Sequence, residues 1–356
     1  MQDSVKRSMR AMVLQQPGEL QLRHVDIPRI GPQEILVKVD VALTCGTDLK
    51  TYKRGHPLIG LPVILGHEFA GTVAEAGREV EKISEGMRVV AANTAPCNNC
   101  FFCKKGRHNL CVHVMERANW GAFAEYIKIP SHIVKVNTYE IPPKVSSQAA
   151  AFLEPLACVI LGNEAADIQL ADTVALVGTG PIGLLHLQLA RQRGAAQIIA
   201  TDLSEGRLRI AKTLGATHTI NADKEDQVAL TKQLTEGRGA DVVIESVGLS
   251  STWETAVKMT RRGGTTVLFG GPPPGSTVTI DASRLHYDEL TLKGVFHHTP
   301  RTVETAFRMI TSGNVQTEPL VTHVKPLEDL EEAFNLVASG RAVKVAITPG
   351  KRGEGA

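Results

Sequence analysis

The sequence predicts an α/β protein with two domains, one mainly β and one built on a doubly wound parallel sheet. From Thr173 onward, apolar strand-like segments alternate with helix-like stretches, which is the pattern of a parallel sheet covered on both faces. A glycine-rich turn at 178–183 joins the first of these strands to its helix. The first 150 residues instead combine short strands, frequent Gly and Pro, and long connections, which favours a mainly β domain.

Composition and charge favour a small-molecule partner. The chain has 356 residues, 43% of them hydrophobic, and 39 basic residues stand against 37 acidic ones for a net charge of +2. So small a net charge gives no field that would attract nucleic acid or a membrane surface. The N-terminus has no apolar segment of the signal-peptide type, and no uncharged apolar run approaches the ~18 residues of a membrane span. We therefore expect a cytoplasmic protein.

The turn after the first strand predicts a dinucleotide site. An apolar strand from Thr173 leads into Gly178-Thr179-Gly180-Pro181-Ile182-Gly183, which opens a helix, and a second strand follows. Glycines at this spacing let the backbone approach a pyrophosphate at the helix N-terminus, although a tight turn without ligand has the same local form. In this strand, turn and helix context we expect the site, with cofactor contacts from Gly178, Gly180, Pro181, Ile182 and Gly183.

The end of the second strand predicts the choice of cofactor. Asp202 stands where a carboxylate accepts hydrogen bonds from the ribose hydroxyls of NAD and repels the 2′-phosphate of NADP. Arg207 is close enough in sequence to oppose this preference, but we expect it on the helix that follows. The sequence therefore predicts NAD as the cofactor.

The rest of the chain completes the predicted domain boundaries. Further strands are expected at 242–245, 265–269 and 290–295, with a turn at 262–264. From about residue 297 a helix at 327–336 and a strand at 343–347 are expected to return to the first domain. The prediction is a catalytic domain of residues 1–157 and 297–356 and a cofactor domain of residues 158–296.

Four of the six cysteines fall within one short stretch, Cys97, Cys100, Cys103 and Cys111. In a reducing compartment such a cluster holds a metal more often than disulfides. Four thiolates form the closed tetrahedral set that structural zinc prefers, so we expect a zinc lobe at 93–113. Lys104, Lys105 and Arg107 leave open a zinc ribbon that binds nucleic acid.

A second set of metal-binding residue types is spread along the chain. Cys45, His67, Glu68 and Glu154 offer a thiolate, an imidazole and carboxylates, enough for a catalytic zinc with one open position. Each residue alone is more often structural, so the prediction depends on whether the fold brings them together.

Taken together, these motifs resemble the zinc-dependent medium-chain alcohol dehydrogenases. The likeness rests on Gly66-His67-Glu68-x2-Gly71-x5-Gly77, Cys45-Gly46-Thr47-Asp48, the four-cysteine lobe, and the glycine turn with Asp202. Glu154 stands where the alcohol dehydrogenase zinc set has a second cysteine. That difference is similar to the sorbitol (polyol) and threonine dehydrogenase branch.

The resemblance implies a GroES-like catalytic domain, a Rossmann cofactor domain, two zinc ions per chain, NAD, and a homo-oligomer, either a dimer or a tetramer. Structural zinc would lie on the four clustered cysteines. Catalytic zinc would lie on Cys45 and His67, with Glu68 and Glu154 bound directly or through water. Cys158 is expected to belong to the core.

The implied activity is oxidation of a secondary alcohol, such as a polyol or sugar alcohol, to a ketone. Thr47 is expected to pass the hydroxyl proton outward, whereas Lys50 replaces the histidine usual in this branch. Substrate contacts are expected from Lys50, Trp120, His297 and His298, and a nicotinamide contact from Phe296. The alternatives are an L-threonine 3-dehydrogenase-like activity and a catalytically silent nucleotide-binding sensor.

Overall fold

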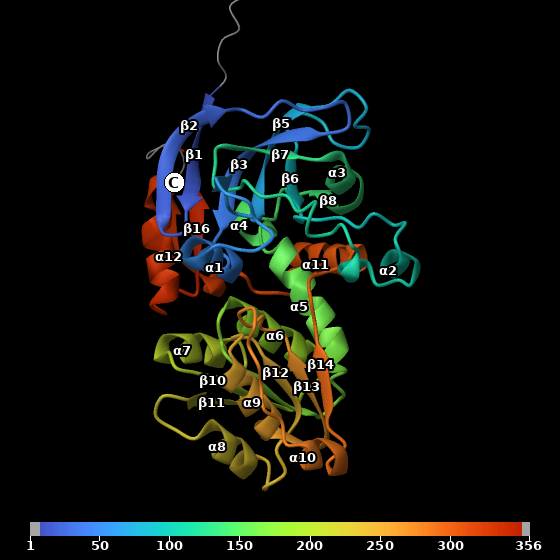
Figure 1. Ribbon diagram of the computed structural model, residues 1–356, viewed down its shortest axis with the longest axis vertical. Helices are drawn as coiled ribbons and strands as arrows, with labels where there is room; N and C mark the ends of the chain where they lie inside the picture. Colours follow the sequence, from blue (N-terminus) through green and yellow to red (C-terminus); the bar gives the residue numbers. More distant parts are fainter. Residues whose placement is uncertain (1–7, 351–356) are drawn as a thin grey trace, which may run out of the picture. The chain divides into compact units, whose positions relative to one another are not determined.

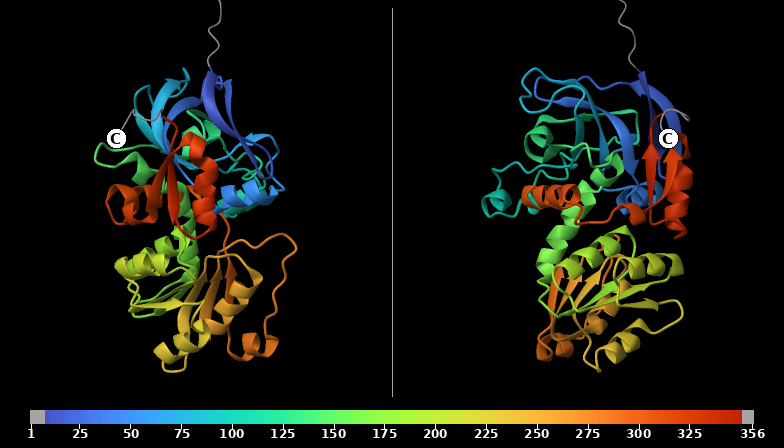
Figure 2. Two further views of the ribbon diagram at one scale, coloured as in Figure 1. Left: turned by 90° about the vertical axis from the view of Figure 1, so that its left-hand side faces the viewer. Right: turned by 180° about the vertical axis from the view of Figure 1, so that it is seen from behind.

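The computed structural model describes residues 8–350 and divides the chain into two compact units (Figures 1 and 2). The first unit takes in the chain up to Ala157 together with the chain from His298 on, and the second is Cys158–His297. The chain passes from one to the other within helix α5 (Leu153–Ala166). That the first unit is catalytic and the second binds NAD stays a prediction.

The first unit is built on two sheets. Strand β1 lies between β2 and β4 in a three-stranded sheet. A seven-stranded sheet has the order β15-β16-β3-β5-β6-β8, with β7 also paired to β3. The strands are β1 (Ser8–Gln16), β2 (Glu19–Asp26), β3 (Ile35–Leu43), β4 (Val63–Ile64), β5 (Glu68–Ala76), β6 (Arg88–Ala91), β7 (Tyr126–Ile129), β8 (Thr138–Glu140), β15 (Val321–Pro326) and β16 (Lys344–Thr348). The end of the chain thus adds two strands to a sheet that begins near its start.

Strand β3 is the centre of the larger sheet because its sequence, ILVKVDVAL, suits burial on both faces. Only Lys38 is exposed on it. The core around it includes Phe69, Phe123 and Phe334, all with at most 1% of their surface exposed. The paired strands β3 and β5 therefore bring together the residues that follow β3 and those that begin β5.

Short helices fill the connections of the first unit. They are α1 (Gly46–Arg54), α2 (Phe101–Lys104), α3 (Ser131–Asn137), α4 (Ser147–Ala150), α11 (Pro300–Thr311) and α12 (Leu330–Ala338), with 3₁₀ turns η1 (His108–Leu110), η2 (Glu318–Leu320) and η3 (Leu327–Asp329). The helix expected at 327–336 is therefore a 3₁₀ turn followed by α12.

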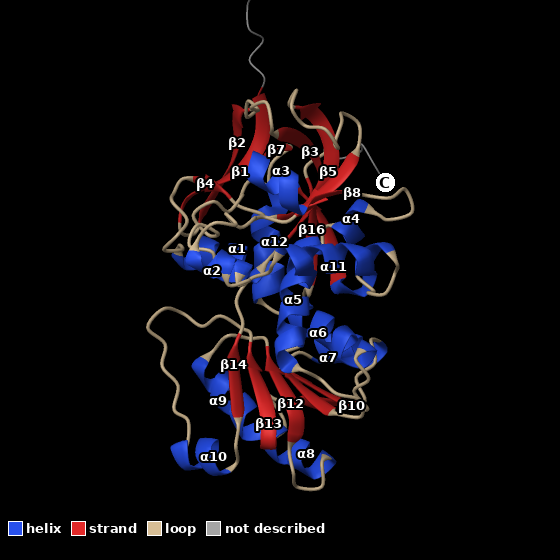
Figure 3. Cartoon of the chain, turned by 90° about the vertical axis from the view of Figure 1, so that its right-hand side faces the viewer, coloured by secondary structure: helices blue, strands red, loops and turns tan. Residues whose placement is uncertain are grey.

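The second unit is a six-stranded sheet, parallel throughout, in the order β11-β10-β9-β12-β13-β14. Helices cover both of its faces (Figure 3), which confirms the predicted fold class. The strands are β9 (Thr173–Val177), β10 (Gln197–Asp202), β11 (His218–Asn221), β12 (Ala240–Glu245), β13 (Thr260–Leu268) and β14 (Thr291–Gly294). The helices are α6 (Pro181–Gln192), α7 (Glu205–Thr213), α8 (Gln227–Leu234), α9 (Ser250–Met259) and α10 (Ala282–Tyr287). No helix described between residues 8 and 350 is long and apolar enough to cross a membrane.

The prediction of a turn at 262–264 is wrong. These residues lie inside β13, where the register with β12 shifts between Ala240↔Thr260 and Val242↔Thr265. The extra residues bulge out of the ladder, and Gly263 has φ +67. Two adjacent glycines signal a bulge as well as a turn, and the sequence alone does not separate the two.

Candidate active site

Three of the predicted metal ligands meet at the end of β3. Cys45, His67 and Glu68 each offer one ligand atom, and these atoms all lie within 4.8 Å of one another. Because Leu43 pairs with Glu68 across β3 and β5, the residues just beyond these two positions are brought side by side. Cys45 also caps helix α1, and its Sγ accepts a hydrogen bond from the Thr47 N–H at 3.5 Å.

Asp48 orients the imidazole of His67. The Asp48 Oδ1 lies 3.3 Å from His67 Nδ1, and the carboxylate is fully buried. It also accepts hydrogen bonds from the backbone N–H groups of Cys45 and Gly66, both at 3.2 Å. Burial would lower the pKa of His67, but the charges of Asp48 and Cys45 outweigh burial and raise it well above its ordinary value. A carboxylate behind one ring nitrogen and a thiol near the ring is the arrangement of a metal-binding histidine.

Glu68 is held by a buried lysine that the sequence analysis missed. Lys344, the first residue of β16, forms an ion pair with Glu68 Oε2, and both side chains are 1% exposed. The other carboxylate oxygen, Oε1, is buried and has no hydrogen-bond partner among the described residues. An unpartnered buried oxygen next to a thiol and an imidazole fits a zinc ligand, so the residues present suit the metal.

Glu154 belongs to a second group of polar side chains, and its role as a metal ligand stays a prediction. Its carboxylate lies within 4.8 Å of a ring nitrogen of His298. His298 is 3% exposed, and its Nε2 lies 3.3 Å from Asn93 Oδ1. Two predicted residues, Glu154 and His298, thus share a buried polar cluster in the first unit with Asn93, which the sequence analysis did not single out.

The four clustered cysteines also come together. Ligand atoms of Cys97, Cys100, Cys103 and Cys111 lie within 4.8 Å of one another, and the sulfurs of Cys97 and Cys103 are 4.0 Å apart. Hydrogen bonds from backbone N–H groups lower the pKa of Cys97 and lower that of Cys100 to about 6. Burial instead raises the pKa of Cys103. Four sulfurs in one local loop are the donor set of a closed zinc site.

The glycine turn of the second unit has the geometry of a dinucleotide site. Gly178 has φ +92, and a Cβ on Gly183 would stand 2.0 Å from Gly178 O, so both positions require glycine. Apart from Gly180 itself and its two neighbours in the chain, no described atom lies within 4 Å of where a Cβ on Gly180 would stand, which leaves that side of the turn open. Gly180 caps α6 and Pro181 is its first residue, so the N–H groups of Ile182 and Gly183 are the ones at the helix N-terminus without a partner inside the helix.

Asp202 ends β10 beside this turn. Its Oδ2 accepts a hydrogen bond from Thr179 N at 2.7 Å, and its Oδ1 accepts one from Ser204 N at 2.9 Å. Arg207 lies on α7, as expected, with Nη1 3.9 Å from Asp202 Oδ1. The carboxylate is therefore fixed at the carboxyl end of a parallel strand, where such sheets bind nucleotides.

The remaining predicted residues lie around the metal set or at the end of the second unit. Thr47 is half-buried in the first turn of α1, and Lys50 is exposed on the same helix. Phe296 is 49% exposed, and His297, the last residue of the second unit, has φ +63. Phe296 and His297 therefore lie on the connection that leaves the parallel sheet after β14.

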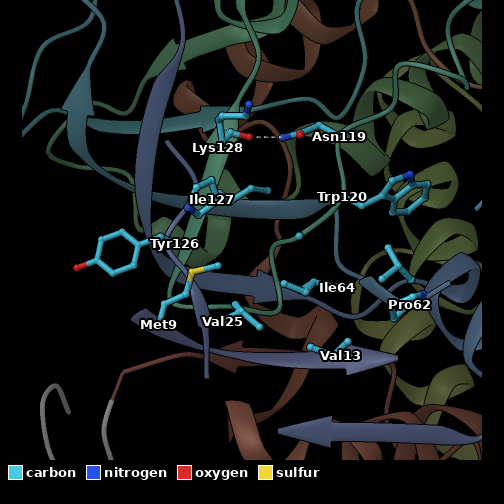
Figure 4. Close-up of a pocket in the computed structure, with 13 residues that line it drawn as sticks. Met9, Val13, Val25, Pro62, Ile64, Asn119, Trp120, Tyr126, Ile127 and Lys128 are labelled. Carbon is cyan, nitrogen blue, oxygen red and sulfur yellow. Dashed lines mark hydrogen bonds between the residues drawn. The ribbon is translucent and has the colours of Figure 1, made fainter. Parts of the chain in front are cut away.

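Trp120 contacts the metal set and also lines a separate pocket. Its ring meets the ring of His67 edge-on, with centroids 4.9 Å apart. It also walls a pocket of about 450 Å³ that is mostly apolar, with Met9, Pro62 and Ile64 among the lining residues (Figure 4). None of the three clustered metal ligands lines this pocket.

Comparison with known proteins supports the same assignment. Two family profiles match, "Alcohol dehydrogenase GroES-like domain" over residues 31–138 and "Zinc-binding dehydrogenase" over residues 181–312. An erythritol/L-threitol dehydrogenase of Mycolicibacterium smegmatis is 35% identical over 98% of this chain and all of its own length. The chain belongs to the zinc-dependent medium-chain alcohol dehydrogenase family.

Other relatives of this dehydrogenase point to the branch. A sorbitol dehydrogenase of Bacillus subtilis is 33% identical and covers 99% of this chain and 100% of its own. An L-threonine 3-dehydrogenase of Bacillus velezensis is 35% identical and covers 92% of this chain and 95% of its own. These matches confirm the predicted polyol and threonine dehydrogenase branch.

A solved structure agrees as well. A candidate zinc-binding dehydrogenase from Sinorhizobium meliloti 1021, bound to NADP, is 34% identical with a TM-score of 0.88 and covers 96% of this chain and 99% of its own. This dehydrogenase is thus an oxidoreductase of the alcohol dehydrogenase type, in a family that uses zinc and a nicotinamide dinucleotide.

Proposed function

We propose that this dehydrogenase oxidises a secondary alcohol of a polyol or sugar alcohol to a ketone, with zinc on Cys45, His67 and Glu68 and with NAD as hydride acceptor. The observation that carries the proposal is the cluster of these three side chains, with ligand atoms within 4.8 Å of one another. Three protein ligands with a fourth position open are the composition of catalytic zinc sites.

Bound zinc would supply a Lewis acid for the alcohol hydroxyl, and bound NAD would accept the hydride. The chain's own groups position and transfer the proton. Asp48 keeps one nitrogen of His67 turned toward the metal set. The hydroxyl of Thr47, two residues after Cys45, accepts the alcohol proton and passes it outward. Lys50, exposed one turn later, occupies the position where this branch usually has a histidine.

NAD is proposed as the preferred cofactor because Asp202 presents a fixed carboxylate beside the glycine turn. Two observations make the cofactor preference the part of the proposal to measure first. The guanidinium of Arg207 lies 3.9 Å from Asp202 Oδ1, and one relative is bound to NADP. We expect kcat/KM to favour NAD and expect Asp202→Ala to narrow the difference. Equal use of both cofactors by the parent would contradict the preference.

A polyol substrate is favoured by two relatives that span nearly the whole chain, the erythritol/L-threitol dehydrogenase and the sorbitol dehydrogenase. The buried cluster of Glu154, His298 and Asn93 adds polar groups suited to a substrate with several hydroxyls. A threonine dehydrogenase-like activity is the second candidate, because the L-threonine 3-dehydrogenase of Bacillus velezensis is also 35% identical to this chain.

The test is NADH formation over a panel of polyols, sugars, β-hydroxy amino acids and simple alcohols, with parent protein and Thr47→Val. Polyols should give the highest kcat/KM. Thr47→Val should keep zinc and fold but slow oxidation by about 10²- to 10⁴-fold, as for a lost proton-transfer group. Threonine as the best substrate would select the second candidate, and no turnover on any alcohol would favour a nucleotide-binding sensor.

A further inference from the structure

The ion pair between Lys344 and Glu68 is the most deeply buried charged contact near the metal set. Both side chains are 1% exposed, and they come from strands on opposite sides of β3. Lys344 Nζ also donates a hydrogen bond to Thr44 O at 2.8 Å and lies 5.7 Å from the centre of the Phe152 ring. These contacts fix the position of the Lys344 ammonium group.

Lys344 offsets only part of the negative charge near the metal set. Its ammonium contacts one oxygen of Glu68 and the carbonyl oxygen of Thr44. A further buried carboxylate, that of Asp48, lies beside His67. Buried charge of one sign is costly unless a cation of matching charge joins it.

We infer that Lys344 is a positioning residue that engages one oxygen of Glu68 and leaves Oε1 as the single oxygen offered to zinc. The inference rests on the proposed function, because it assumes a metal on Cys45 and His67. It makes Glu68 the third ligand in preference to Glu154, whose carboxylate groups with His298. It also predicts that the two members of the pair affect zinc binding in opposite directions.

Removal of Lys344 and removal of the Glu68 charge should change zinc affinity in opposite directions, because each leaves a different charge without its partner. Without Lys344, the metal-free site holds more uncompensated negative charge, both oxygens of Glu68 are free to bind, and zinc should bind more tightly. Without the Glu68 charge, zinc loses a ligand and meets an uncompensated ammonium. A pair that only stabilised the fold would weaken zinc binding whichever partner is removed.

The test is the zinc dissociation constant of the weaker site, measured by competition with a chromophoric chelator on the full chain. Glu68→Gln should weaken zinc binding by about 10- to 100-fold. Lys344→Met should tighten it, and Lys344→Arg, which keeps the ion pair, should leave it near the parent value. Cobalt substitution adds a second signal: Lys344→Met should lose visible absorption as a second Glu68 oxygen raises the coordination number, and Lys344→Arg should keep it.

Weaker zinc binding in both Lys344→Met and Glu68→Gln would overturn the inference. If Lys344→Met folds only with zinc, the metal replaces the missing positive charge and the inference is supported. If Lys344→Met does not fold at all, Glu68→Gln decides, since an unchanged zinc affinity in that variant overturns the inference. A parent that binds only one zinc, on the four cysteines, would instead contradict the proposed function itself.

Discussion

Single residues of the four-cysteine lobe differ in how readily each gives up its proton. Cys100 directly precedes helix α2 and accepts hydrogen bonds from backbone N–H groups, which lower its pKa to about 6, while Cys103 is buried and its pKa is raised. A thiolate that forms near neutral pH offers a first attachment point for a metal, and the deeper thiol binds as the metal displaces its proton.

Removal of Cys100 should therefore destabilise the first unit. We expect Cys100→Ser to hold one zinc fewer per chain and to melt at a lower temperature, because a closed thiolate site contributes folding free energy directly. Metal analysis and thermal unfolding of the same preparation measure both effects. Cys158→Ser, which changes a cysteine outside the lobe, is the matched control. A Cys100→Ser protein with the parent's zinc content and melting temperature would mean that the lobe holds no metal.

Among the elements, α6 carries a buried histidine that plays no part in the proposed chemistry. His186 is fully buried, accepts a hydrogen bond from Asn163 Nδ2 at its Nδ1 at 2.7 Å, and meets the ring of Phe269 edge-on. Burial lowers the pKa of His186 to about 3, from an ordinary value of 6.5. His186 is therefore buried on α6 as a neutral imidazole.

This burial predicts acid sensitivity of the second unit. Between pH 6.5 and 3 the unfolded chain binds a proton at His186 that the folded chain does not bind. The free energy of unfolding should thus fall as pH falls through this window, by up to about 1.4 kcal/mol per pH unit from this one group. His186→Gln should flatten that slope in denaturant titrations at several pH values, with exposed His24→Gln as the control. An unchanged slope in His186→Gln would contradict the assignment.

The helices and strands also show which features could be predicted from the sequence and which could not. The glycine turn at 178–183 and the cysteine lobe are local, so spacing together with the flanking strand and helix was enough to predict that these residues come together. The pairing of Lys344 with Glu68 joins residues 276 positions apart, and only the order of β16, β3 and β5 brings them together. A lysine inside the apolar run Val343-Lys344-Val345-Ala346-Ile347 was the available signal, since a charge there must be paired.

At the scale of the whole molecule, the two units divide the predicted chemistry. The metal set lies in the first unit, and the glycine turn and Asp202 lie in the second, Cys158–His297. Each set is built on its own sheet, with its own core. Loss of one set should leave the other able to bind, because neither takes a ligand-binding side chain from the other unit.

His67→Ala tests this division. It should lower zinc content by one per chain and abolish turnover, because the metal set loses its imidazole, the group that Asp48 faces. NAD affinity, measured by calorimetry or by quenching of protein fluorescence, should stay within a few-fold of the parent, because the nucleotide contacts lie in the other unit. Asp202→Ala is the reciprocal control, since it should weaken NAD binding and leave both zinc ions in place. A His67→Ala protein that no longer binds NAD would mean that zinc and nucleotide bind as one coupled site, and the separate assignment of the two units would then fail.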